Sequence, residues 1–356
     1  MDRSALARRR ASTRGRRRRV AAALMVAVAL AACGTQDKTP TAATTSATPP
    51  PPPPPPPVYW PLTGLESGEV PARPALAVKI ENSLDARPQT GLNSADMVWE
   101  EVVEGGITRF VAVYHSTLPP QIGPIRSVRP MDPAIAAPLH GLFAFAGGQR
   151  PFVDAITREG LQIISDNVGS AGFVRLKTRY APHNLYADPA AFLAQADPAH
   201  QAAPAAQFTI AGPGQQPTAV AAGAPTAAVN LKLSGVSQPT WTWDPAGQWL
   251  RAEGATPAVE ADGTQLHAAN VVVLRVAVVN TRFADVAGNP VPETQLVGTG
   301  KALVATGGRS LAATWTKNSA VGPVSLTGAD GMPVVLAPGN TWVELVPIRT
   351  GSVTVG

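Results

Sequence analysis

The chain contains 356 residues, of which 45% are hydrophobic and one is a cysteine. A single cysteine excludes a disulfide bond within the chain, so the hydrophobic cores have to hold the fold. The formal net charge is +5, but residues 1–32 carry nine arginines and one acidic residue, which leaves 20 basic and 23 acidic residues in the remainder. That remainder is near −3 and lacks the overall positive charge that favours binding to nucleic acid phosphates.

The first 33 residues have the layout of an export signal. An arginine-rich segment comes first, an apolar stretch covers residues 20–30, and two alanines stand directly before Cys33. This order is typical of a bacterial lipoprotein signal peptide over residues 1–32, with lipid attached to the Cys33 sulfur. The apolar stretch is shorter than the roughly 20 residues that a membrane-spanning helix needs. We therefore expect a lipid-anchored protein on the extracytoplasmic face of the cell membrane. Secretion without lipid is the alternative, and both Sec and Tat export stay open.

Residues 33–58 are predicted to form a disordered stalk. Thr, Ala and Ser dominate residues 34–48, and nine consecutive prolines occupy residues 49–57. Such a composition buries too little apolar surface to fold, and a proline run adopts polyproline II at about 3.1 Å per residue. A stalk of about 28 Å holds the folded part away from the membrane, inside the cell wall. A proline-rich ligand for another domain is the alternative.

Residues 59–207 mix strand and helix signals and predict an α+β domain. Residues 76–81 alternate apolar and polar side chains, as expected of a half-buried strand. Residues 97–103 and 107–116 are further strand candidates, and Glu104-Gly105-Gly106 between them favours a hairpin.

A strand–helix–strand unit is predicted later in the same domain. Residues 142–146 and 161–165 are the strands, and the helix between them starts at Pro151 and stops at Gly160. Asp188 followed by Pro189 predicts a second helix over residues 190–196.

The rest of the chain predicts a linker and a second, mainly β domain. Residues 208–225 are rich in Ala, Pro and Gly, as expected of a linker. Residues 226–356 alternate strand-forming segments with turns such as Asp244-Pro-Ala-Gly247, which favours a sandwich or a barrel. We expect strands over residues 229–233, 240–243, 248–252, 271–279, 311–317, 334–336 and 341–346.

The tryptophans of the second domain allow two interpretations. Trp241 and Trp243 lie two residues apart in a predicted strand and therefore share one face. Exposed rings on that face would stack on sugars. Core packing is the alternative, and aromatic residues in strands more often belong to the core.

Several longer motifs resemble the YerB-like lipoproteins, a family without an assigned biochemical activity. Trp99 stands where that family has a tyrosine, and Val102 where a proline is common. The resemblance implies a two-domain surface lipoprotein and supplies no reaction. It rests on residues 73–82, 86–92, 95–101, 104–110, 123–130 and 181–186 of the first domain, and on residues 315–317 and 338–342 of the second.

The first candidate binding residues are Arg126, Ser127 and Arg129, in a loop bounded by prolines. Two guanidinium groups suit a phosphate or carboxylate ligand. Gly147 and Gly148 precede the helix at Pro151, whose N-terminus would add free backbone N–H groups if the loop packs beside it. The alternative is that both arginines pair with acidic residues and hold loops together; the candidates are Glu100, Glu101, Glu104 and Asp132.

His183 and Asn184 complete the predicted ligand-binding set, because they occupy a loop next to Arg179 and Tyr180. A loop histidine can act as an acid or base, but no nucleophile accompanies it, so a structural or ligand-orienting role is preferred. The histidines lack metal-ligand spacing and the cysteine is assigned to lipid, so we expect no metal, no cofactor and no defined catalytic residue.

These observations favour a non-catalytic envelope module. We expect it to bind an anionic cell-wall component or an envelope protein partner through the Arg126, Arg129 and His183 loops. The alternative is a cell-wall glycan hydrolase or transferase that uses acidic residues of the first domain, such as Glu100, Glu104 or Asp132, or His183.

Overall fold

The computed structural model describes residues 56–356 of the chain. The predicted signal peptide, the lipid attachment at Cys33 and nearly all of the predicted stalk lie outside the described residues.

The N-terminal part contributes five strands to a twelve-stranded sheet, in the order β4-β5-β3-β6-β7. β4 and β5 form the predicted antiparallel hairpin, and Gly105 and Gly106 between them adopt φ values of 68° and 77° that suit glycine. β6 and β7 are parallel and joined by α2, which ends just before Gly160, so the strand–helix–strand prediction is confirmed. The elements are β3 (Leu76–Glu81), β4 (Met97–Val102), β5 (Thr108–Tyr114), β6 (Leu142–Phe145), α2 (Arg150–Arg158) and β7 (Gln162–Ser165).

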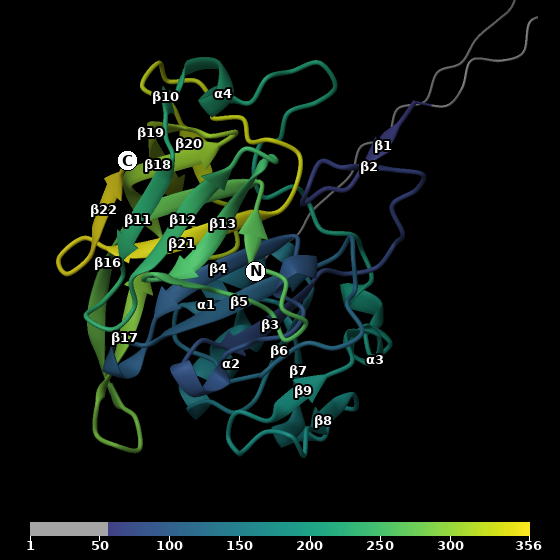
Figure 1. Cartoon of the computed structure of the whole chain (residues 1–356). Helices are drawn as coiled ribbons and strands as arrows, with labels where there is room; N and C mark the ends of the chain where they lie inside the picture. The colour runs from purple at the N-terminus through teal and green to yellow at the C-terminus, as the bar shows by residue number, and fades with distance from the viewer. Residues whose placement is uncertain (1–55) are drawn as a thin grey trace, which may run out of the picture. The chain divides into compact units, whose positions relative to one another are not determined.

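The C-terminal part continues the same sheet in the order β10-β19-β18-β16-β21, with β17 paired to β16 and β20 paired to β19. β21 lies between β16 and β4 and is parallel to both, so it joins the two parts (Figure 1). The strands are β10 (Ala224–Pro225), β16 (Asn270–Ala284), β17 (Pro290–Gln295), β18 (Gly298–Thr306), β19 (Arg309–Lys317), β20 (Ser325–Thr327) and β21 (Thr341–Pro347).

A second, six-stranded sheet is antiparallel and packs against the larger one, as in a sandwich. Trp241 on its inner face is buried, and its ring centroid lies 5.1 Å from that of Trp342 in β21. Trp241 therefore belongs to the core and offers no face to a sugar. The strands are β11 (Ala228–Lys232), β12 (Pro239–Asp244), β13 (Gln248–Glu253), β14 (Thr256–Pro257), β15 (His267–Ala268) and β22 (Ser352–Val355).

The fold class predicted from the sequence is confirmed: mixed α/β in the N-terminal part and mainly antiparallel β in the C-terminal part.

Asp188 caps α3 by accepting hydrogen bonds from the N–H groups of Ala190 and Ala191. Residues 208–225 contain α4, and Ile210 forms a bridge to Leu336. The limits of the predicted domains stay a prediction. The remaining elements are β1 (Val58–Tyr59), β2 (Glu66–Ser67), α1 (Asp132–Ala136), β8 (Phe173–Arg175), β9 (Leu185–Ala187), α3 (Pro189–Leu193) and α4 (Thr218–Ala222).

β3 differs from the half-buried strand that its alternation predicts, because all six of its residues are buried. One face of the sheet carries a core shared with α1 and α2, and the other face carries a core shared with the second sheet. Polar residues of β3, such as Lys79 and Glu81, therefore lie inside the protein and need charged or hydrogen-bonding partners.

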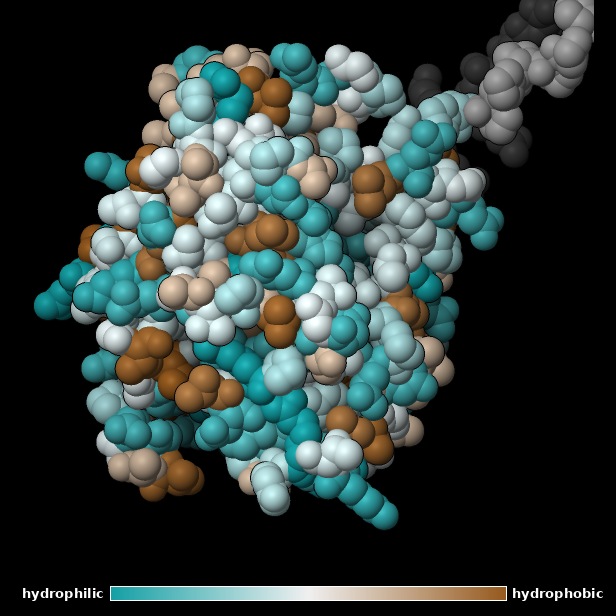
Figure 2. Space-filling model, in the orientation of Figure 1, coloured by the Kyte–Doolittle hydropathy of each residue, from teal (hydrophilic) through white to brown (hydrophobic). Residues whose placement is uncertain are grey.

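The surface shows small, separate groups of hydrophobic residues on the face seen in Figure 2. Within residues 56–356, every helix is too short or too polar to cross a bilayer.

Candidate functional site

A buried group of charges lies on the helix side of the sheet, where β3 and β4 meet α1. The Lys79 ammonium contacts the Glu101 carboxylate and lies 2.7 Å from Asp132 Oδ1, and all three side chains are fully buried. Burial and the neighbouring Asp132 charge raise the pKa of Glu101 to about 8. This group has no contact with solvent, so it supports the structure and cannot reach a ligand.

A second group of charges lies at the end of β3, nearer the surface. Glu81 Oε2 is 3.0 Å from Arg126 Nε and 2.9 Å from His183 Nδ1, so one carboxylate oxygen holds both predicted site residues. Arg126 and His183 are each about one-fifth exposed, whereas Glu81 is buried. The arginine is therefore oriented by a buried acid and keeps part of its side chain accessible.

Arg126 lines a small pocket of about 180 Å³. Gly147 lies on the same pocket, and within residues 56–356 its backbone N–H has no hydrogen-bond acceptor. Arg175 adds a second, largely exposed guanidinium that lies 3.5 Å from Asp166. Asn167 and the Asp166 carboxylate also line the space, so hydrogen-bond donors of two arginines and an amide lie beside one acid. The donors suit a small anionic group.

The pocket occupies a predictable place in the fold. Gly147 follows β6 and Asn167 follows β7, and these neighbouring strands are parallel. Ligands in open α/β sheets bind outside the carboxyl ends of parallel strands. The predicted parallel pair was thus the signal that could have identified Asp166 and Asn167, which sequence reasoning missed together with Arg175.

Ser127, Gly148 and Asn184 do not line this pocket, but each is next in sequence to a residue that does. His183 lines a separate cavity together with Arg179 and Tyr180. The Ser127 carbonyl accepts a hydrogen bond from Arg109 at 2.9 Å, and Asn184 accepts one from Arg175 at 3.2 Å. Gly148 is in contact with Val128, because a Cβ on this glycine would lie 2.3 Å from the Val128 side chain.

Arg129 points to a different partner from Arg126. Its Nε lies 2.7 Å from Glu104, and its backbone N–H donates to Asp132 at 2.6 Å. These contacts match the alternative in which an arginine of this loop ties loops together. Whether the predicted set binds a ligand stays a prediction.

A third group of charges is buried between the two sheets and joins them. Arg251 of β13 is fully buried and donates to Glu100 of β4 at 2.6 Å and to Glu344 of β21 at 2.8 Å. Burial opposes ionisation of Glu100, but the Arg251 guanidinium outweighs it and leaves the pKa of Glu100 below its usual value. Burial and the Glu100 charge raise the pKa of Glu344 well above its usual value. Glu253 is the third acidic partner, 2.9 Å from Arg251, so one guanidinium is surrounded by three carboxyl groups.

Within residues 56–356, no cluster of three His, Cys, Asp or Glu side chains has the arrangement of a metal site. His115 is buried and packs edge-on against Trp60, with ring centroids 5.2 Å apart.

Two family models match the chain. The N-terminal domain of "Protein of unknown function (DUF3048)" matches residues 62–202, and the C-terminal domain of the same family matches residues 229–343. The chain belongs to the DUF3048 family. The first model covers Arg126, Gly147 and Arg175 of the pocket.

A curated relative from Bacillus subtilis (strain 168) is named "Putative lipoprotein YerB". It is 49% identical over 70 residues, which are 19% of this chain and 21% of the relative, so the match spans about a fifth of the relative's length. The crystal structure of the YerB protein from Bacillus subtilis has a TM-score of 0.71 and 22% identity, and covers 83% of this chain and 99% of that one. This likeness shows a shared fold, and the YerB-like resemblance read from the sequence is confirmed.

Proposed function

We propose that this chain is a lipid-anchored, extracytoplasmic binding protein that takes an anionic group of a cell-wall component in the Arg126 pocket. The observation that carries the proposal is that one small cavity is lined by Arg126, Arg175 and Gly147, whose N–H has no acceptor among the described residues. Forked guanidinium donors and a free backbone N–H are the groups that recognise phosphate and carboxylate oxygens.

The charges around the pocket favour one small anionic group over a polymer that carries many negative charges. Glu81 neutralises Arg126, and Asp166 partly neutralises Arg175, so the pocket has little net charge. Binding then depends on hydrogen-bond geometry more than on long-range attraction, and we expect its affinity to fall only moderately with salt.

The anchor is part of the proposal. A basic and then apolar segment before Cys33 supports lipid attachment there, and the name of the Bacillus relative agrees with it. An envelope protein could present the same anionic group as a wall polymer, which makes it the second ligand to test.

The burial of the acidic residues argues against glycan cleavage. A glycosidase needs two carboxyl groups that reach the scissile bond. Glu100 and Asp132 are fully buried, and Glu104 is held by Arg129. The same acids therefore serve as partners for buried cations.

The test is calorimetric titration of the full chain with soluble peptidoglycan fragments and with inorganic phosphate. We expect Arg175→Ala to weaken binding by about tenfold, as expected for one charge-assisted contact. The matched control is Arg158→Ala, since Arg158 is an exposed arginine at the far end of α2. Equal binding by both variants, or no binding by the unmodified chain, contradicts the proposed pocket. Steady release of fragments from purified cell wall supports the enzymatic alternative.

A further inference from the structure

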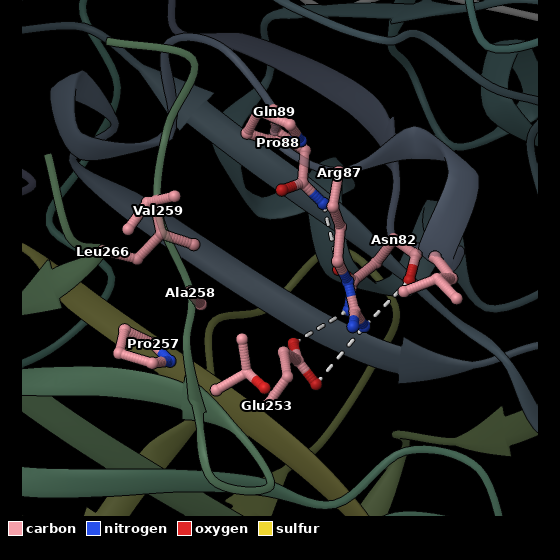
Figure 3. Close-up of a pocket in the computed structure, with 11 residues that line it drawn as sticks. Asn82, Arg87, Pro88, Gln89, Glu253, Pro257, Ala258, Val259 and Leu266 are labelled. Atoms are coloured by element: carbon pink, nitrogen blue, oxygen red, sulfur yellow. Dashed lines mark hydrogen bonds and ion pairs between the residues drawn. The ribbon is translucent and has the colours of Figure 1, made fainter. Parts of the chain in front are cut away.

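A larger cavity, of about 370 Å³, lies between the loop after β3 and the hairpin formed by β13 and β14 (Figure 3). It brings the N-terminal and C-terminal parts together and is separate from the Arg126 pocket. Its polar end is formed by Asn82, Arg87 and Glu253, and its apolar wall by Pro88, Val259 and Leu266. A cavity of this size with an apolar wall and a few convergent polar groups is the usual form of a binding site.

One wall of the cavity is an uncovered strand edge. The Ala258 N–H donates to the Arg251 carbonyl at 3.1 Å, and the Ala258 carbonyl accepts from Leu266 at 2.8 Å. Because successive residues of a strand direct their backbone groups to opposite edges, the Val259 N–H and the Pro257 carbonyl point the other way. Among the described residues, the Val259 N–H has no acceptor.

Only part of this edge is paired within the chain, by Gln89. Gln89 forms a parallel bridge with Glu260, and its carbonyl accepts from the Ala261 N–H at 2.8 Å. The residues before Gln89 turn away at Pro88 toward Arg87, as Figure 3 shows. The edge beside Pro257 and Val259 therefore has room for a strand that would continue the line of Gln89.

The polar end of the cavity offers a hydrogen-bond donor, and its charges balance each other. The Arg87 side chain lies 3.3 Å from Glu253 Oε2, and its Nε donates to Asn82 at 3.0 Å. Its Nη1 has no acceptor within residues 56–356. Since Glu253 already balances the guanidinium, an uncharged acceptor such as a peptide carbonyl fits this end better than an anion.

We propose that this cavity binds a short, uncharged, apolar peptide segment of a partner protein, which pairs with Pro257–Val259 as an added parallel strand. The peptide backbone accepts from the Val259 N–H and donates to the Pro257 carbonyl. One apolar side chain of the peptide packs against Leu266 and Pro88, and a carbonyl of the peptide faces Arg87. The proposal is independent of the anion pocket and uses none of its residues.

The decisive experiment compares two peptides on the same protein. The full chain is reconstituted in lipid nanodiscs and titrated against fluorescein-labelled Gly-Ala-Val-Leu-Val-Ala-Gly amide, with fluorescence anisotropy as the readout. We expect saturable binding, and at least about tenfold weaker binding when the central three backbone nitrogens of the peptide are methylated. N-methylation removes the donors that an added strand needs and leaves the apolar side chains in place.

Two protein variants locate the bound peptide. Leu84 is 79% exposed at the rim of the cavity, so Leu84→Asp changes the wall without disturbing the core. Val259→Pro removes the free N–H. We expect each variant to lose about tenfold in affinity, while Val286→Asp, a fully exposed control on another loop, binds as the unmodified chain does.

Three results overturn the proposal: absence of saturable binding, equal affinity of the methylated peptide, or unchanged affinity of Leu84→Asp. If Val259→Pro fails to fold, the two peptides on the unmodified chain still decide the question. Equal binding of both peptides identifies a simple apolar pocket without strand addition.

Discussion

Replacing Arg251 tests whether the charges between the two sheets hold the fold together. Arg251 is fully buried, contacts three carboxyl groups and lies within 5.5 Å of the ring centroids of Phe110, Trp241 and Trp342. Arg251→Met keeps the apolar stem of the side chain and loses the guanidinium group, which lies between the rings. It therefore removes the charge, its hydrogen bonds and the contacts of the guanidinium group with the rings.

The expected loss follows from the carboxylate that stays behind. Glu100 is ionised and fully buried, and Arg251 is its closest cation at 2.6 Å. Removing one partner of a buried ion pair costs about 3–5 kcal/mol, against a total stability of about 5–15 kcal/mol for a typical protein. Glu344→Gln is the matched comparison: burial and the Glu100 charge raise the pKa of this carboxyl well above its usual value, so an uncharged amide should cost no more than about 1 kcal/mol.

The assay is urea denaturation of each variant at neutral pH, followed by tryptophan fluorescence. Arg150→Met serves as a surface control, because the Arg150–Asp154 pair is mostly exposed and should contribute about 0–1 kcal/mol. The prediction is refuted if Arg251→Met lowers the free energy of unfolding by less than about 1 kcal/mol, or if Arg251→Met and Glu344→Gln lower it equally. Arg251 would then not be the cation that balances buried Glu100.

Three further predictions concern single sites. Burial and the Arg73 charge lower the pKa of His115 to about 4, so the folded ring stays neutral while the unfolded ring takes a proton. This contribution, at most about 3 kcal/mol, is fully present above pH 6.5 and is lost as the pH falls toward 4; His115→Phe should flatten that slope in denaturation curves. Gly148→Ala should destabilise by about 1–3 kcal/mol because its Cβ would overlap Val128, and an unchanged melting temperature contradicts this. Asp188→Ala should lower the stability by about 1 kcal/mol because it removes the cap of α3, whereas Asp188→Asn should keep most of that stability in the same melting assay.

Local patterns predicted the parts of the fold that depend on neighbouring residues. The β4–β5 hairpin follows from the glycine pair between two apolar runs, and α2 follows from Pro151 and Gly160. β17 and β18 escaped prediction for an equally local reason: Pro290 and Pro292 in one, and Gly298 and Gly300 in the other, weaken the strand signal. Residues 334–336 formed only an isolated bridge at Leu336 instead of the predicted strand.

The candidate site was predictable only where it follows from strand order. Arg126 and Gly147 meet because the loop after β6 and the loop before α1 both lie at the carboxyl end of the parallel strands. Arg129, three residues from Arg126, turns to Glu104 instead. Sequence spacing placed both arginines in one loop, but the choice of partner depends on the hairpin that carries Glu104, which is a tertiary contact.

The pairing of β21 with β4 was beyond local prediction, yet the charges explain why only one register is stable. Every residue of β21 is buried, including Glu344, because β21 lies inside the sheet and both faces are covered. A slip by one residue would move the Glu344 side chain to the opposite face, away from Arg251, and would leave an unpaired polar group in the core on each side. Buried charges add little net stability when paired but cost several kcal/mol when separated. Glu344 and Arg251 therefore act chiefly by penalising the wrong alignment of the two parts.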